Sequence, residues 1–286
     1  MNYILFFFTS LSILIIALTI IVLLFMILIA PGKRMRRKKL SLPDFFYAHR
    51  GLFNDRFPEN SMGAFARAVS EGYGIELDVQ LSADNEVVVF HDNTLTRACG
   101  IDKRVDELTL RELKALRLFG SEERIPELSE ALKLVKGAVP LIIELKCPNT
   151  STVPPLCEAV SKILESYHGE YCIESFNPMI LVWYKRHRPQ IIRGQLSDAF
   201  MRNKNTRSVL YFILHNMLLN ISARPDFIAY NHQNFGAIAF RAISRFYRPA
   251  LVAWTIRSQN ELDIARPLFD RFIFEGFIPK KNNTSS

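Results

Sequence analysis

The sequence predicts an α/β protein: a (β/α)8 barrel of eight parallel strands preceded by a single N-terminal transmembrane helix. Two patterns predict the barrel, since eight short apolar runs recur along the chain and helix-length stretches separate them. The transmembrane helix is indicated by the absence of any charged residue between Tyr3 and Ala30. The 286 residues suffice for both, because a barrel usually needs about 250. We therefore expect an anchor over residues 1–30, a basic juxtamembrane linker over 31–43 and a barrel domain over 44–286.

The N-terminal apolar run is longer than the roughly 20 residues that cross a bilayer as a helix. A secretory signal peptide is the alternative, but its positive residues would precede a shorter apolar core. Here the basic residues follow the apolar run, and they are Lys33, Arg34, Arg36, Arg37, Lys38 and Lys39. Lys and Arg mark the cytoplasmic side of a span. We therefore expect a single-pass protein of the cell membrane with its catalytic domain on the cytoplasmic side.

The formal net charge of +8 comes mostly from the six basic residues of the linker, so we expect no nucleic-acid partner. The rest of the charge is unevenly distributed: residues 44–170 sum to −7 and residues 171–286 sum to +9. The basic linker is expected to contact the anionic leaflet of the membrane, and the basic half of the domain is expected to face the same lipid. The cysteines show no close pair of the kind that binds zinc or exchanges thiols, which fits a reducing compartment. They are Cys99, Cys147, Cys157 and Cys172.

The expected strands are apolar runs of four to six residues. Helices are expected between them: one begins at Asn60 and Ser61, one is capped by Thr109, and one extends over 127–136 until Gly137 stops it. The eight strands are predicted over 45–48, 75–79, 141–146, 171–175, 191–196, 226–230, 251–255 and 271–274.

Reactive side chains follow or end the first two strands, which is where a barrel presents its chemistry. His49 comes directly after the first run. In the second, Glu76 and Asp78 share one face, because alternate residues of a strand point to the same side. A two-residue turn at Asp84 and Asn85 would return the chain as a hairpin and pair Asp78 with His91.

The third strand adds Glu144 and Lys146, which also share one face. Three carboxylates that converge on one point favour a hard divalent cation, Mg²⁺ or Ca²⁺, over zinc. The alternative is an inert core in which Glu76 and Glu144 form ion pairs with Arg50 and Lys146.

The stretch 209–219 is apolar on almost every side and follows several basic residues. It is expected either to dip into the membrane surface or to lie buried against the barrel, and apolar helices are more often buried. The remaining histidines carry no pattern of a site and are expected to be structural. They are His168, His187, His215 and His232.

Several motifs occur in a fixed order: His49-Arg50-Gly51, Pro58-Glu59-Asn60-Ser61, Glu76-Leu77-Asp78-Val79, His91-Asp92 and Glu144-Leu145-Lys146. With them the chain resembles the glycerophosphodiester phosphodiesterase family over residues 45–280. The resemblance is thinner after Lys146, where Ser175-Phe176 and Trp254-Thr255 are its marks.

The resemblance implies a TIM barrel of the phospholipase C-like phosphodiesterase type and a role for each motif residue. His49 and His91 would be the catalytic acid and base. Glu76, Asp78 and Glu144 would bind the metal. Arg50 and Lys146 would bind the phosphate, and Phe176 and Trp254, which taken singly suggest core packing, would line the substrate site.

The resemblance also implies the reaction: metal-dependent hydrolysis of glycerophosphodiesters to sn-glycerol 3-phosphate and an alcohol, which the anchor would place at the membrane surface. The nucleophile would be water or the glycerol hydroxyl of the substrate. One alternative is a lysophospholipase D that acts on lysophospholipids, and another is a catalytically silent module that binds phospholipid head groups. The chain departs from the family at its last strand, where Phe274-Glu275-Gly276-Phe277 replaces a Thr-Asp pair, and Glu275 is given no role.

Overall fold

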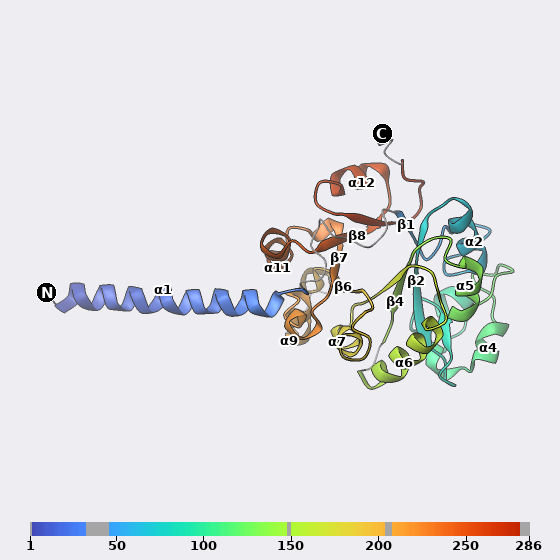
Figure 1. Ribbon diagram of the computed structural model, residues 1–286, viewed down its shortest axis with the longest axis horizontal. Coiled ribbons are helices and arrows are strands. Elements are labelled where there is room, and N and C mark those ends of the chain that lie inside the picture. Colours follow the sequence, from blue (N-terminus) through green and yellow to red (C-terminus); the bar gives the residue numbers. More distant parts are fainter. Residues whose placement is uncertain (1, 33–45, 148–149, 204–207, 281–286) are drawn as a thin grey trace.

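The predicted eight-stranded barrel is confirmed in a computed structural model, which describes residues 2–32, 46–147, 150–203 and 208–280. Eight parallel strands close because β1 pairs with both β2 and β9, and β3 adds an antiparallel edge (Figure 1). Phe45 and the linker from residue 33 onward lie outside the described residues. The strands are β1 Phe46–His49, β2 Gly74–Leu81, β3 Val87–Val89, β4 Leu141–Leu145, β5 Tyr171–Ser175, β6 Arg193–Ser197, β7 Phe227–Asn231, β8 Ala250–Ile256 and β9 Arg271–Phe274.

Helices surround the barrel, and the expected N-caps Ser61 and Thr109 accept backbone hydrogen bonds at the starts of α2 and α4. The α-helices are α1 Asn2–Ile29, α2 Met62–Ser70, α3 Thr96–Cys99, α4 Leu110–Ala115, α5 Leu128–Val135, α6 Val153–Leu164, α7 Pro178–His187, α8 Phe200–Asn203, α9 Val209–His215, α10 Asn220–Ala223, α11 Ile238–Ala242 and α12 Gln259–Ala265. Three short 3₁₀-helices are η2 Val105–Glu107, η3 Thr150–Thr152 and η4 His232–Asn234, and η5 Ile243–Tyr247 is a π-helix that continues α11.

The strands alternate between two environments. On β2, Ile75 and Leu77 belong to the large core between the barrel and its helices. On β4 and β5, Ile142 and Cys172 belong instead to a smaller cluster together with Tyr47 of β1. Because the side-chain period of a strand is two, the positions two residues beyond this inner cluster face the barrel axis nearer its C-terminal mouth.

The predicted hairpin forms, but its predicted register is wrong by one residue. Ser82 donates its backbone N–H to the carbonyl of Glu86 at 2.9 Å, so three residues form the turn instead of two. Asn85 accommodates the extra residue by taking a left-handed conformation with φ 62°. Phe90 therefore pairs with Asp78, and His91 lies one residue further along the chain.

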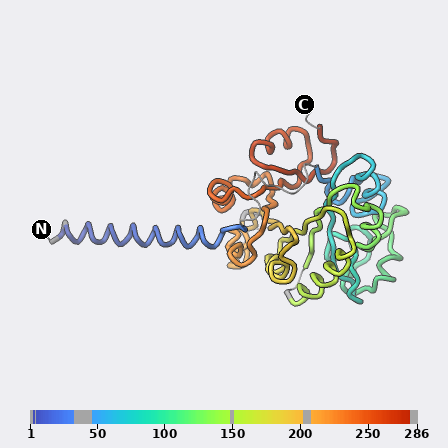
Figure 2. Tube along the Cα trace, in the orientation of Figure 1, coloured from blue at the N-terminus to red at the C-terminus, as the bar shows by residue number. Residues whose placement is uncertain are grey.

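The hypothesis that 209–219 is a helix buried against the barrel is wrong for α9. None of the residues of α9 is buried within the described structure, and Val209, Leu210 and Phe212 are exposed by 73%, 59% and 48%. The long helix α1 projects from the barrel beside α9, as Figures 1 and 2 show. Its segment Leu5–Ile29 is long and apolar enough to cross a membrane.

Candidate active site

Strand register brings the sequence-predicted acidic residues together. His49 pairs with Glu76 across β1 and β2, and Asp78 pairs with Glu144 across β2 and β4. Paired residues in neighbouring strands share a face. One oxygen from each of the carboxylates Glu76, Asp78 and Glu144 lies within 4.8 Å of the others.

These carboxylates fit a divalent cation by chemistry and by burial. Glu76, Asp78 and Glu144 are exposed by only 2%, 0% and 7%. The Oδ1 atom of Asp78 makes no hydrogen bond among the described residues, although the Nζ atom of Lys146 lies 3.3 Å away. Glu174, which pairs with Glu144 on the next strand, adds a fourth buried carboxylate. Two cations, Arg50 and Lys146, cannot form ion pairs with all four buried carboxyl groups, which disfavours an inert ion-pair core.

The predicted phosphate-binding residues lie at the same acidic cluster. Lys146 places its Nζ 3.1 Å from Glu144 Oε1, and Arg50 places its Nε 3.4 Å from Asp78 Oδ2. The backbone of Arg50 has a left-handed φ of 56°, and its N–H donates to Glu76 Oε2 at 3.1 Å. This conformation aims both the backbone donor and the side chain of Arg50 at the carboxylates.

Two residues of the Pro58–Ser61 motif support this arrangement from behind. The amide Nδ2 of buried Asn60 donates to Asp78 Oδ2 at 2.8 Å. Glu59 accepts from Arg50 Nη1 at 2.8 Å and from Arg97 Nη2 at 2.6 Å. Asn60 therefore orients a candidate metal ligand, and Glu59 orients a candidate phosphate-binding cation.

Each of the two predicted histidines has its Nδ1 atom against a carboxylate. His49 Nδ1 contacts Glu275 Oε2, and its Nε2 lies 3.9 Å from Glu76 Oε2. His91 Nδ1 lies 2.5 Å from Asp92 Oδ1. An ionised carboxylate only accepts hydrogen bonds, so in the neutral imidazole Nδ1 carries the proton and Nε2 is left free to accept one.

Burial and the crowding of charges set the protonation of the site. Burial raises the pKa of Glu76 well above its ordinary value, and burial raises that of Glu144 to about 7. Burial alone would raise the pKa of Asp78 too, but the positive charge of Lys146 and its neighbours holds it below the usual range. Burial lowers the pKa of both His49 and His91. Neutral imidazoles can accept a proton, as a general base must.

The site opens into a cavity of about 140 Å³ at the barrel mouth. Phe176 and Trp254, the predicted substrate-lining residues, form one wall, with ring centroids 5.5 Å apart and planes at 85°. Among the other predicted site residues, those that line the cavity are His49, Arg50, Glu76, His91 and Glu144. Asp78 and Lys146 complete the set, because Asp78 contacts Arg50 and Lys146 contacts Glu144.

Sequence reasoning missed two acidic residues. Glu275 follows β9 directly and contacts His49, while Arg257 Nε donates to its other oxygen at 2.7 Å. Glu275 could have been predicted, because it directly follows the last strand and the C-terminal ends of barrel strands carry the site. Glu174 is two residues beyond Cys172 on β5, so the period-two rule that selected Glu76 and Asp78 would have selected it as well.

Comparison with solved structures supports the fold. A phosphodiesterase from Oleispira antarctica, solved with its product sn-glycerol 3-phosphate, superposes with a TM-score of 0.65 at 24% identity, covering 82% of this chain and 93% of that one. A glycerophosphodiester phosphodiesterase from Thermotoga maritima superposes with a TM-score of 0.63 at 25% identity, covering 81% and 94%.

Comparison with curated sequences identifies relatives over part of their length. A glycerophosphodiester phosphodiesterase from Caldanaerobacter subterraneus is 38% identical over 52% of this chain and 65% of its own. A lysophospholipase D from Homo sapiens is 31% identical over 51% and 49%. The chain thus spans from about half to just under two thirds of the length of these relatives. The family model described as the glycerophosphoryl diester phosphodiesterase family matches residues 49–268, and the chain belongs to that family.

Proposed function

We propose that the protein is a divalent-cation-dependent glycerophosphodiester phosphodiesterase that releases sn-glycerol 3-phosphate and an alcohol at the membrane surface. The observation that carries the proposal is a cluster of two histidines, three buried carboxylates and two cationic side chains at the barrel mouth, most of which line one cavity. Family membership supports the same chemistry.

Glu76, Asp78 and Glu144 would hold Mg²⁺ or Ca²⁺, since all three ligands are oxygen donors. When bound, the cation supplies positive charge that polarises a phosphoryl oxygen. Arg50 and Lys146 bind the remaining phosphate charge from the edge of the carboxylate cluster. Their fixed positions orient the phosphodiester between the two imidazoles.

His49 and His91 carry the proton transfers. One imidazole accepts the proton of the attacking hydroxyl at its free Nε2, and the other gives a proton to the oxygen of the departing alcohol. The carboxylates Glu275 and Asp92 hold the two rings by Nδ1 and stabilise the imidazolium form in each case. Phe176 and Trp254 form an aromatic wall of the cavity that excludes water from the substrate on that side.

The full chain in phospholipid nanodiscs provides the test. Glycerol 3-phosphate release from glycerophosphocholine is measured with Mg²⁺, with Ca²⁺ and with a chelator. Release should require a cation and should fall by about 10²- to 10⁴-fold in His49→Ala, the range of general acid–base catalysis. The exposed His168 lies outside the cavity, so His168→Ala is the matched control and should retain full activity. Equal release with and without chelator would contradict the proposal.

A second candidate, lysophospholipase D activity, is favoured by an apolar groove of about 420 Å³ beside the site. The groove begins at Glu144 and Lys146 and extends along Met179 to Leu210 and Leu214 of α9. Leu214→Trp should obstruct an acyl chain in the groove. It should therefore reduce hydrolysis of lysophosphatidylcholine while leaving hydrolysis of glycerophosphocholine, which has no acyl chain, unchanged. Equal losses on both substrates would argue against the second candidate.

We also propose that α1 is a single membrane span with the barrel on the cytoplasmic side, because six basic residues follow it over 33–39. A protease-sensitive reporter fused after Ser286 should be cleaved only after the cells are opened. Cleavage in intact cells would place the barrel outside.

A further inference from the structure

The C-terminal end of α1 packs against the helices that surround the barrel. Ile29 is fully buried, and the Nδ2 atom of Asn220 donates to its carbonyl at 3.1 Å. The hydroxyl of Tyr247 donates to the carbonyl of Met26 at 2.5 Å, and Arg224 Nη1 donates to the carbonyl of Ala30 at 3.2 Å. The last carbonyls of a helix have no partner within it. Here α10, η5 and the residue after α10 supply those partners, which fixes the direction in which α1 leaves the barrel (Figure 1).

The length of α1 places this junction at the lipid headgroups. The helix has 28 residues, and about 20 of them cross the hydrocarbon core. Phe25 and Met26, in the last turns, already pack against the barrel core. When the apolar residues before Phe25 fill the bilayer core, the parts of the barrel domain that touch Phe25 and Met26 lie at the surface of the bilayer.

Large apolar side chains are exposed on both sides of this junction. On one side, Val209 and Leu210 of α9 are exposed by 73% and 59%. On the other side, Ile238 of α11 and Phe246 of η5 are exposed by 78% and 72%. Helix α9 leads into α10, and α11 leads into η5, so the two exposed groups flank the elements whose side chains hydrogen-bond to the end of α1. Figures 1 and 2 show α9 and α11 on either side of the end of α1.

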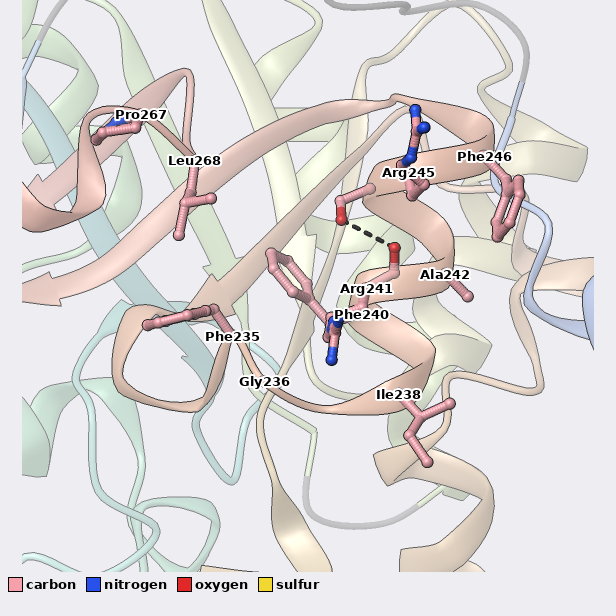
Figure 3. Close-up of a pocket in the computed structure, with 11 residues that line it drawn as sticks. Phe235, Gly236, Ile238, Phe240, Arg241, Ala242, Arg245, Phe246, Pro267 and Leu268 are labelled. Atoms are coloured by element: carbon pink, nitrogen blue, oxygen red, sulfur yellow. Dashed lines mark hydrogen bonds between the residues drawn. The ribbon is translucent and has the colours of Figure 1, made fainter.

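Two arginines accompany the apolar side chains. Arg241 and Arg245 are exposed on α11 and η5, and neither forms an ion pair with any described residue. Figure 3 shows Phe240 projecting from α11 toward Phe235, whereas Ile238 and Phe246 project to the other side of the helical segment. These residues, with Arg241 and Arg245, line a hollow of about 800 Å³. Apolar and aromatic side chains interleaved with Arg are typical of protein segments that lie in the interface of an anionic membrane.

We propose that this anchor-side face, formed by Val209, Leu210, Phe212, Ile238 and Phe246 with Arg241 and Arg245, docks on the anionic bilayer that α1 spans. The apolar side chains enter the headgroup region and the two arginines meet lipid phosphates. The proposal rests on the proposed membrane span of α1. Leu210 belongs both to this face and to the apolar groove beside Glu144 and Lys146, so docking opens that groove at the lipid surface.

Photo-crosslinking of the full chain in nanodiscs that contain phosphatidylglycerol tests the face directly. The photoreactive residue p-benzoylphenylalanine replaces Phe246 in one variant and Phe119 in a matched control, because Phe119 is an exposed phenylalanine whose ring contacts Arg97 of α3 and lies outside the anchor-side face. A third variant carries it in place of Leu14, in the middle of α1. After irradiation, mass spectrometry measures the fraction of chain that carries one phospholipid.

Lipid adducts at positions 246 and 14 but not at 119 are the expected result, with at least a tenfold excess of position 246 over position 119. Adducts at 14 alone would overturn the anchor-side face and leave the membrane span intact. Adducts at none of the positions would overturn the span and the face together. A crosslink from position 246 to a second copy of the chain would assign the face to self-association instead.

A second measurement tests the arginines. The double variant Arg241→Gln/Arg245→Gln, combined with the photoreactive residue at 246, should lower the adduct yield by about threefold or more, because it removes two attractions to anionic lipid. The control double variant Arg104→Gln/Arg111→Gln removes two charges from the far side of the barrel and should leave the yield unchanged. Equal yields in both double variants would exclude a role for Arg241 and Arg245.

Discussion

His49, at the end of the first barrel strand, contacts through its Nδ1 the carboxylate of Glu275, which directly follows the last strand. The contact is possible because β1 and β9 are neighbours in the closed barrel. Burial would raise the pKa of Glu275, but the contact with His49 and the positive charges of Arg257 and Arg50 together outweigh burial and lower that pKa to about 2. The carboxylate is therefore ionised and accepts a hydrogen bond from the Nδ1–H of His49, which leaves His49 Nε2 free toward the cavity.

Removing the charge of Glu275 should weaken catalysis by His49, although the imidazole itself remains in place. We expect Glu275→Gln to lower kcat/KM for glycerophosphocholine by about 10- to 100-fold, because a positioning carboxylate contributes less than the base itself. Glu275 raises the pKa of His49, so its loss should also shift the acid limb of the pH profile of kcat/KM toward lower pH. The measurement is that profile at saturating cation concentration.

Glu275→Asp keeps the charge with a shorter side chain, and it should restore the position of the acid limb even where part of the rate is lost. A pH profile identical to wild type in Glu275→Gln would show that Glu275 does not act through His49.

Most residues of the candidate site could be predicted from the alternation of side chains along the strands. Because the period of a strand is two, the sequence alone placed Glu76 and Asp78 on one face, and Glu144 joined them through the register of β2 and β4. The C-terminal ends of barrel strands meet at one mouth, so a histidine after the first strand was expected there as well. These inferences depend only on local geometry and on the closure of the barrel.

The features that were missed depend on details that local patterns do not contain. Glu275 becomes a neighbour of His49 only when the last strand closes on the first. The hairpin register depends on whether Asn85 takes a left-handed conformation, which shifts His91 by one position. The apolar composition of α9 predicted burial, whereas the structure exposes it. The sequence alone does not show that α1 packs against the neighbouring helix α10, which places α9 beside the anchor.

Asn60 should control cation affinity through Asp78. Its side chain is 2% exposed and donates to Asp78 Oδ2 at 2.8 Å. We expect Asn60→Ala to weaken cation binding by about 10- to 100-fold, because a ligand that loses its supporting hydrogen bond is less well oriented. Isothermal titration of the chelator-treated chain with Ca²⁺ and Mg²⁺ measures the affinity.

The adjacent residue offers a matched control. Ser61 caps α2 by accepting from the backbone of Ala64 at 3.1 Å and touches none of the candidate metal ligands. Ser61→Ala should therefore lower stability by about 1 kcal/mol while leaving cation affinity unchanged. Equal affinities in Asn60→Ala and Ser61→Ala would contradict the role given to Asn60.

The pH dependence of stability should change with the cation. Burial raises the pKa of Glu76, and it raises that of Glu144 to about 7. In the absence of cation the folded chain therefore binds more protons at these groups than the unfolded chain does. The contribution of both groups to stability is fully present below the unfolded pKa, near 4.5. The part that Glu144 supplies is lost as the pH rises through about 7, and the part that Glu76 supplies is lost as the pH rises through its own raised pKa. Cation binding requires the deprotonated carboxylates, so it should stabilise the chain more at pH 8 than at pH 5.5.

Thermal unfolding of the full chain in detergent micelles, with and without Ca²⁺ or Mg²⁺ at both pH values, measures this difference. A cation at about 100 times its Kd should add ~2.7 kcal/mol at pH 8, and less at pH 5.5 because protons compete for the carboxylates. Glu144→Gln keeps the size of the side chain but removes one ligand, so it should abolish most of the cation effect at both pH values. A cation-induced shift that is as large in Glu144→Gln as in wild type would mean that the ion binds elsewhere, and the three-carboxylate site would have to be abandoned.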